Sequence, residues 1–257
     1  MEREQVDVTF GTSSGLRLAA ILDRPVAEPR GYAVFAHCFT CTKDYLAPAR
    51  IARGLAERGI AVLRFDFTGL GESCGDFGET SFSTNIADVE AACTYLRDHH
   101  GQPRLLMGHS LGGAAVLAAA PLVEGVRAVV TLAAPSKPGR LQRLFEPVVD
   151  ELRQRGSAEV VVGGRPFRIG RAFVDDLESY SVQEVAGRLG AALLVLHSPT
   201  DEVVHIDSAR EIFQAARHPK SFLSLDGVDH LLSSRQDAQW VTSIIHAWGS
   251  RYLEPGR

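Results

Sequence analysis

The chain has 257 residues, of which 45% are hydrophobic, and its formal net charge is −4. This length can bury one large core, and we expect one domain over residues 1–257 that carries an insertion. Lys and Arg are spread along an acidic chain, so nucleic acid is not an expected partner. The sequence has no apolar N-terminal signal region and no apolar run long enough to span a membrane, so we expect a cytoplasmic protein without membrane contact.

The four cysteines are Cys38, Cys41, Cys74 and Cys93. They lack the repeated close pairs of a zinc site and the density of a disulfide framework, so we expect reduced thiols. The sequence pairs no base with Cys38 or Cys41. We therefore favour small buried thiols at both positions over a redox or nucleophilic role, which stays open.

Predicted strands and helices alternate along the first half of the chain. Val6–Phe10 and Leu16–Leu22 are β-prone runs around a Gly-Thr-Ser-Ser-Gly turn, which predicts an opening hairpin. Gly59 is expected to end a helix. Further strands are predicted at Gly31–Ala36, Ile60–Phe65 and Leu105–Met107, and helices at Leu46–Arg58 and Ser83–His100.

The same alternation returns near the C-terminus. Strands are predicted at Ala128–Leu132, Ala191–Leu196 and Ser221–Leu225, and helices at Ser208–Ala216 and Gln236–Tyr252. Repeated strand–helix units predict an α/β fold, in which a parallel sheet carries helices on both faces through right-handed crossovers.

The alternation is interrupted at about residues 136–187, where we expect a cap over the pocket. Leu141–Arg155 has the pattern of an amphipathic helix, and Glu159–Ile169 that of a hairpin turning at Gly163 and Gly164. Apolar side chains of this segment either pack as core or line an acyl or alcohol pocket. They are Leu141, Leu144, Phe145, Val148, Phe167 and Phe173.

The segment Arg104–Leu117 contains a short apolar run, the sequence Gly-His-Ser-Leu-Gly and a run of small residues. This order predicts a strand, a sharp turn with Ser110 at its apex, and a helix. Gly108 and Gly112 suit such a turn because strand and helix pass close together there. The free N–H groups and partial positive charge of the helix N-terminus would suit an oxyanion that develops beside Ser110.

Four other stretches accompany this turn: His37-Cys-Phe-Thr40, Arg64–Ser73, an Asp after a late strand, and Gly227-x-x-His230. With the turn they resemble the α/β-hydrolase superfamily, over nearly the whole chain. The chain is most similar to bacterial serine esterases with a short cap, found alone or fused to an OsmC-type domain. The resemblance implies the α/β-hydrolase fold, with a mostly parallel eight-stranded sheet, helices on both faces and a small cap insertion.

A serine hydroxyl needs an adjacent base, and that base needs an acid to hold its tautomer. We expect His230, between the last strand and the last helix, to be the base. Asp201 follows the preceding strand, and catalytic groups of such sheets lie beyond the carboxyl ends of the strands, so we expect it to be the acid. Asp207 is the alternative acid, although a helix N-terminus is the expected place for it.

Other histidines have supporting roles in this interpretation. His37 and His109 resemble family positions that support loops, while His197 and His205 flank Asp201 and could tune it. The glycines of Arg64–Ser73 lack the remainder of a phosphate-binding loop, so we expect a turn held by Asp66.

Two backbone N–H groups should form an oxyanion hole. One is expected from Leu111, the residue after Ser110. Resemblance to a His-Gly-Phe-Thr pattern implies that the second comes from Phe39, with Cys38 in place of the usual Gly. No His or carboxylate spacing indicates a metal site, and we expect no cofactor.

These residues predict a serine hydrolase that cleaves carboxylic esters, with short to medium acyl chains, through an acyl-enzyme intermediate. The expected partner is a small-molecule ester, and the chain is expected to be a monomer or a homodimer. Thioesterase and peptidase reactions use the same residues and stay open. A ligand-binding or regulatory protein with negligible turnover is the alternative from another class.

Overall fold

The structure is a computed structural model that describes residues 1–162 and 164–253, without the side chains of residues 142–144. The predicted turn residue Gly163 and the side chain of Leu144 lie outside the described residues.

Eight strands form one sheet in the order β1-β2-β4-β3-β5-β6-β9-β10. The hairpin strand β2 pairs antiparallel with both β1 and β4, and every other pair in the sheet is parallel. The mostly parallel eight-stranded sheet predicted above is therefore confirmed. The strands are β1 (Arg3–Gly11), β2 (Arg17–Pro25), β3 (Gly31–Ala36), β4 (Ile60–Phe65), β5 (Pro103–His109), β6 (Ala128–Leu132), β9 (Ala192–His197) and β10 (Lys220–Ser224).

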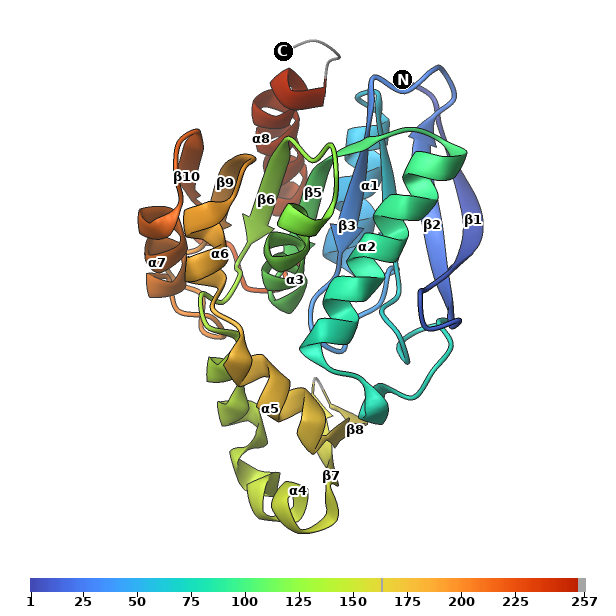
Figure 1. Ribbon diagram of the computed structural model, residues 1–257. Coiled ribbons are helices and arrows are strands. Elements are labelled where there is room, and N and C mark those ends of the chain that lie inside the picture. Colours follow the sequence, from blue (N-terminus) through green and yellow to red (C-terminus); the bar gives the residue numbers. More distant parts are fainter. Residues whose placement is uncertain (163, 254–257) are drawn as a thin grey trace.

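Helices cover both faces of this sheet (Figure 1). One face carries α1 (Leu46–Ala56) and α8 (Arg235–Leu253). The other carries α2 (Phe82–His99), α3 (Leu111–Ala119), α6 (Val182–Arg188) and α7 (Asp207–Ala215). Short 3₁₀ helices lie at Phe77–Glu79 and Ala120–Leu122.

The sheet divides the core into two apolar layers because successive side chains of a strand point to opposite faces. In β3, Ala33 and Phe35 pack towards α1 and α8, whereas Val34 and Ala36 pack towards α2 and α3. All of these side chains are buried. Burial on both faces explains why the central strands read as continuous apolar runs in the sequence.

Most of the segment between β6 and β9 forms the cap, which lies at the opposite end of the molecule from the start of β1 and the end of α8 (Figure 1). The cap contains a 3₁₀ helix (Pro138–Val148), α4 (Val149–Arg155), the hairpin β7 (Ser157–Val162) and β8 (Arg165–Gly170), and α5 (Arg171–Ser179); α6 follows it and packs on the sheet. The predicted hairpin is confirmed. The single helix predicted over Leu141–Arg155 is wrong, because Pro147 lacks an N–H and interrupts the hydrogen-bonding pattern before α4.

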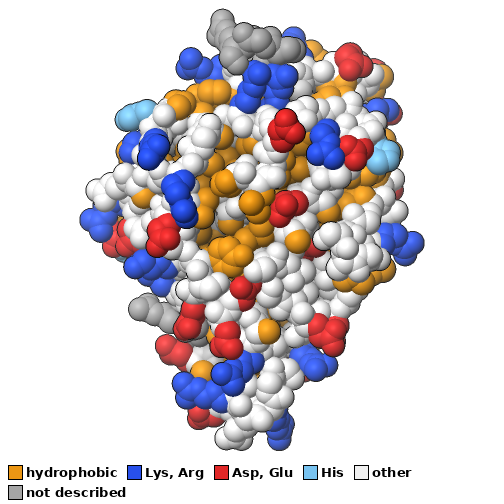
Figure 2. Space-filling model, in the orientation of Figure 1, with side chains coloured by type: hydrophobic (Ala, Val, Ile, Leu, Met, Phe, Trp, Pro, Cys, Tyr) orange, Lys and Arg blue, Asp and Glu red, His pale blue; other side chains and the backbone are white. Residues whose placement is uncertain are grey.

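Hydrophobic side chains gather at the surface between α2 and α6, while charged side chains of both signs cover the cap end (Figure 2). Among the described residues, no helix combines the length and the apolar character needed to cross a membrane.

Candidate active site

Ser110 lies at a strained turn between β5 and α3. Its φ angle is 53°, in the left-handed region that residues with a side chain seldom adopt. A Cβ atom on Gly108 would lie 2.2 Å from the carbonyl oxygen of Gly112, and one on Gly112 would lie 2.2 Å from that of His37. The two glycines are thus required by close backbone packing, and the predicted sharp turn is present.

The structure brings Ser110, His230 and Asp201 together, although 120 and 29 residues separate them along the chain. His230 Nε2 lies 3.1 Å from Ser110 Oγ, and its Nδ1 lies 2.7 Å from Asp201 Oδ2. Because an ionised carboxylate only accepts hydrogen bonds, Nδ1 carries the proton and Nε2 is free to accept one from the serine hydroxyl. All three residues are buried.

Asp201 is held by its own loop after β9. Its Oδ1 accepts hydrogen bonds from the backbone N–H groups of Val203 and Val204, at 2.9 and 2.8 Å. Burial is the largest single influence on Asp201 and opposes its ionisation. The hydrogen bond and charge of His230, together with the two backbone N–H groups, outweigh it and lower the carboxyl pKa below its usual value. The alternative acid Asp207 instead begins α7 and pairs with Arg210 at 3.1 Å.

Two buried histidines fasten the loops that carry Asp201 and His230. His197 Nε2 donates a hydrogen bond to the carbonyl of Val204, and His109 Nε2 donates one to the carbonyl of His230; both distances are 2.7 Å. Burial, followed by the nearby His230, lowers the pKa of His109 to about 3, so its ring is neutral. His205, which also flanks Asp201 in sequence, is exposed and contacts Asp207 at 3.1 Å.

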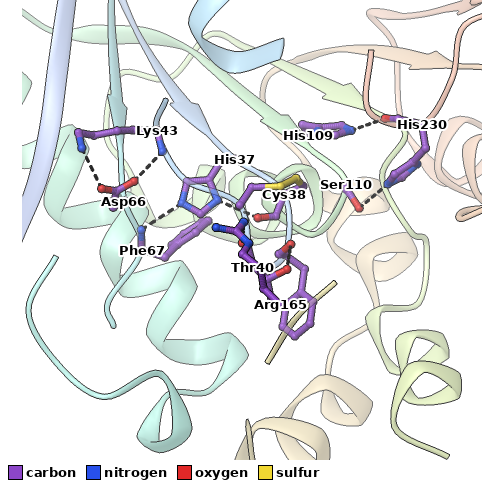
Figure 3. The surroundings of a disulfide bond; sticks show 12 residues. His37, Cys38, Thr40, Lys43, Asp66, Phe67, His109, Ser110, Arg165 and His230 are labelled. Atoms are coloured by element: carbon purple, nitrogen blue, oxygen red, sulfur yellow. Dashed lines mark hydrogen bonds and ion pairs between the residues drawn. A yellow bond between two sulfur atoms is a disulfide. The ribbon is translucent and has the colours of Figure 1, made fainter. Parts of the chain in front are cut away.

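The loop after β3 is closed by a disulfide between Cys38 and Cys41, whose Cα atoms lie 5.3 Å apart (Figure 3). The expectation of four reduced thiols is therefore wrong for this pair, whereas Cys74 and Cys93 are free. A φ angle of 58° at Thr40 turns the chain so that the two cysteines meet. Phe39 and Thr40 are thus enclosed in a small covalent ring.

Phe39 and Leu111, the two predicted N–H donors, line the same narrow pocket between this loop and α3. Leu111 is the first residue of α3, where N–H groups have no partner within the helix. The ring of Phe39 lies 5.5 to 6.0 Å from those of Phe77, Phe145 and Phe173. Residues of the cap and of the loop after β3 therefore share one aromatic cluster.

A buried polar network lies beside the disulfide and supports this loop (Figure 3). Asp66 accepts hydrogen bonds from the backbone N–H groups of Lys43 and Glu72, at 2.6 and 3.0 Å, and pairs with Lys43 Nζ at 3.0 Å. The Nδ1 atom of His37 donates to the carbonyl of Cys38, and its Nε2 accepts from the N–H of Phe67. The predicted turn around Asp66 is confirmed, but sequence reasoning missed the role of Lys43, which is distant in sequence.

Arg165, at the start of β8, links the cap hairpin to the loop after β3. Its Nη2 lies 3.5 Å from the carbonyl oxygen of Thr40, and its guanidinium lies 5.7 Å from the centre of the Phe167 ring. Across the part of the chain that the structure describes, no three His, Cys, Asp or Glu side chains are grouped so that they could hold a metal ion.

Comparisons with known proteins agree with this arrangement. The family model described as Hydrolase_4: Serine aminopeptidase, S33 matches residues 27–156, which is half of the chain. The esterase domain of a Rhodothermus marinus protein is 47% identical; the alignment covers 98% of this chain and 100% of that one, with a TM-score of 0.80.

A solved structure of lower identity has the same fold, and a curated relative matches part of the chain in sequence. Est1E of Butyrivibrio proteoclasticus, solved with bound ferulic acid, is 20% identical over 96% of this chain and 99% of that one, with a TM-score of 0.83. The uncharacterized protein YfhR of Salmonella typhimurium is 24% identical over 69% of this chain. The chain spans 57% of the length of that relative.

A mostly parallel sheet with a serine at a strand-to-helix turn, facing a histidine and an aspartate from later loops, defines an α/β hydrolase. The chain belongs to the S33 serine aminopeptidase family of these hydrolases.

Proposed function

We propose that the protein is a serine esterase that cleaves carboxylic esters through an acyl-enzyme intermediate. The observation that carries this proposal is the aligned series of hydrogen bonds from Ser110 through His230 to Asp201, with distances of 3.1 and 2.7 Å. Such a series lets a hydroxyl lose its proton as it attacks a carbonyl carbon.

The reaction then follows from the positions of these groups. Ser110 Oγ attacks the ester carbonyl while His230 Nε2 accepts the hydroxyl proton. Asp201 keeps the imidazole in its tautomer and stabilises the imidazolium. The proton passes to the leaving alcohol, and a water molecule, deprotonated by the same imidazole, releases the acid from Ser110.

The oxyanion of each tetrahedral intermediate would be bound by the N–H groups of Phe39 and Leu111. Both residues line one narrow pocket, and Leu111 directly follows Ser110 in the chain, which supports this assignment. A preorganised donor of this kind contributes about 3 kcal/mol to stabilisation of the transition state.

The acyl group is proposed to be short to medium in length. The aromatic side chains of Phe39, Phe77, Phe145 and Phe173 pack against one another between the cap and the loop after β3. They fill space that a long acyl chain would need. The 47% identity to a domain described as an esterase supports ester substrates, and the family description favours an aminopeptidase as the second candidate.

Hydrolysis of p-nitrophenyl acetate, butyrate, octanoate and palmitate tests the proposal. Hydrolysis of amino-acid p-nitroanilides, measured in parallel, tests the alternative aminopeptidase activity. We expect turnover of the esters with an optimum at acetate to octanoate, and loss of at least about a thousandfold in kcat for Ser110→Ala. Faster turnover of the anilides would favour the aminopeptidase. Saturable ester binding without turnover would favour the ligand-binding alternative.

A further inference from the structure

A groove of about 660 Å³ lies between α1 and α8, on the face of the sheet opposite to α3. Its charged lining is almost entirely of one sign, although the chain as a whole has a net charge of −4. Five arginines face a single carboxylate. These residues are Arg3, Arg50, Arg53, Arg58, Arg235 and Glu57.

Most of the groove lining comes from one face of α1 and one face of α8. Lining positions 50, 53, 54 and 57 recur at the spacing of one face of α1, and positions 235, 239, 242 and 243 do so on α8. Gly54 lets the two helices approach, because a Cβ atom there would lie 2.8 Å from Thr242 Cγ2. The groove is therefore a feature of the packed helices and not of a loop.

Neutral acceptors hold two of the guanidinium groups in place. Arg50 Nη1 donates a hydrogen bond to the carbonyl of Ser233, and Arg58 Nη1 donates one to the carbonyl of Gly54; both distances are 2.7 Å. A carbonyl orients a guanidinium without cancelling its charge, and most of its five N–H donors remain. The pKa of His246 is lowered, first by burial and then by the charge of Arg58, which agrees with a positive potential along these helices.

The remaining charges are not compensated within the described residues. The single carboxylate, Glu57, pairs with Arg3 at 3.3 Å. No ion pair joins Arg53 or Arg235 to any carboxylate in the described part of the chain. The Nε atom of Arg53 is buried, and no described protein group accepts its hydrogen bond. A buried donor without an acceptor costs stability, which a bound anion would restore.

We propose that this groove binds a small soluble anion that carries two or more linked phosphate groups. The planar fork of a guanidinium matches two phosphate oxygens at once. Arg50 in α1 and Arg58 just past its end are eight residues apart, a separation of about 12 Å in helical geometry, so one phosphate is not expected to contact both arginines. A chain of phosphates can. The proposal is independent of the proposed esterase activity.

Isothermal titration calorimetry of the full chain with tripolyphosphate, pyrophosphate and orthophosphate, at constant ionic strength, tests this site. We expect saturable one-to-one binding that is tightest for tripolyphosphate. Arg53→Gln and Arg235→Gln should each weaken it about tenfold or more. Arg153→Gln, which removes an exposed arginine of the cap, is the matched control and should leave the affinity unchanged.

Arg235 is exposed at the start of α8, so its variant reports on the site even if Arg53→Gln fails to fold. The proposal is overturned if tripolyphosphate gives no saturable heat, if it binds no better than orthophosphate, or if the folded Arg235→Gln variant binds as tightly as the parent chain. Sedimentation with vesicles that contain a phosphorylated inositol lipid, without binding of free tripolyphosphate, would also overturn it.

Discussion

The Nε2 atom of His109 donates a hydrogen bond to the backbone carbonyl oxygen of His230, at a distance of 2.7 Å. His109 directly precedes Ser110, so one buried ring joins the turn of the proposed nucleophile to the loop of the proposed base. A displacement of reacting groups by about 1 Å can cost on the order of a hundredfold in rate. This contact therefore positions His230 without touching the substrate.

We expect His109→Ala to lower kcat for p-nitrophenyl acetate by about ten- to a hundredfold, with a much smaller change in KM. His109→Gln keeps an N–H donor of similar reach and should recover much of the lost kcat. Steady-state kinetics of both folded variants measure the effect. Equal kcat values for His109→Ala and the parent chain would show that the contact does not position the base.

The Cys38–Cys41 disulfide encloses Phe39, whose N–H is a proposed oxyanion donor. Opening the ring should let this donor move, so we expect a fall in kcat of about tenfold in the Cys38→Ser/Cys41→Ser double variant. A reductant should reproduce the fall in the parent chain and leave the double variant unaffected. Cys74→Ser, which removes a free thiol, is the control.

Thiol alkylation followed by mass spectrometry shows whether the disulfide has been opened in each sample. Full activity of the parent chain after complete reduction would contradict a positioning role of the disulfide.

The close packing at the turn of Ser110 predicts a large effect of Gly108→Ala. The added methyl group would lie 2.2 Å from the backbone oxygen of Gly112, and backbone cannot move aside as a flexible side chain can. We expect the free energy of unfolding to fall by about 3 kcal/mol or more. A Cβ on Gly190 meets nothing within 4 Å, so Gly190→Ala should change it by less than about 1 kcal/mol. Urea denaturation compares the two, and similar stabilities would refute the steric argument.

The predicted fold and the predicted site depended on different signals. Strands such as Gly31–Ala36 and Ile60–Phe65 match the structure residue for residue, because burial on both faces leaves long apolar runs. Asp201 and His230 were expected near Ser110 because loops after parallel strands meet at one edge of the sheet and because their surroundings resemble positions of the hydrolase family; the structure brings the three together.

Other features depend on contacts that a local pattern does not contain. The disulfide requires the left-handed φ angle of Thr40, and spacing does not report a backbone angle. Residues 37 and 43 contact the chain near Asp66, more than twenty residues away. The break in the cap helix is different, because Pro147 is visible in the sequence and prevents a continuous helix despite the apolar pattern.

Asp88 gives the fold a distinct pH dependence. Burial raises the pKa of this carboxyl from 3.8 to about 6, although two hydrogen bonds from Thr68 act in the opposite direction and lower it. The native state therefore holds the proton more tightly than the unfolded chain does, and it loses stability as the pH rises from about 4 to about 6. A shift of about two pKa units corresponds to about 3 kcal/mol.

Asp88→Asn removes this titration and keeps polar contacts to Thr68. Between about pH 4 and pH 7, we expect the free energy of unfolding of the parent chain to fall relative to the variant by on the order of 2 to 3 kcal/mol. Urea denaturation of both proteins at the two pH values measures the difference. A difference that is independent of pH would contradict the assigned role of Asp88.

The most direct measurement of the central claim is peptide mass spectrometry after treatment with a fluorophosphonate, which reacts with activated serine hydroxyls. The account predicts one phosphonyl adduct, located on Ser110, and slower labelling in His230→Ala. A folded parent chain that gains no adduct on treatment, or gains it on another residue, would contradict the claim that His230 activates Ser110.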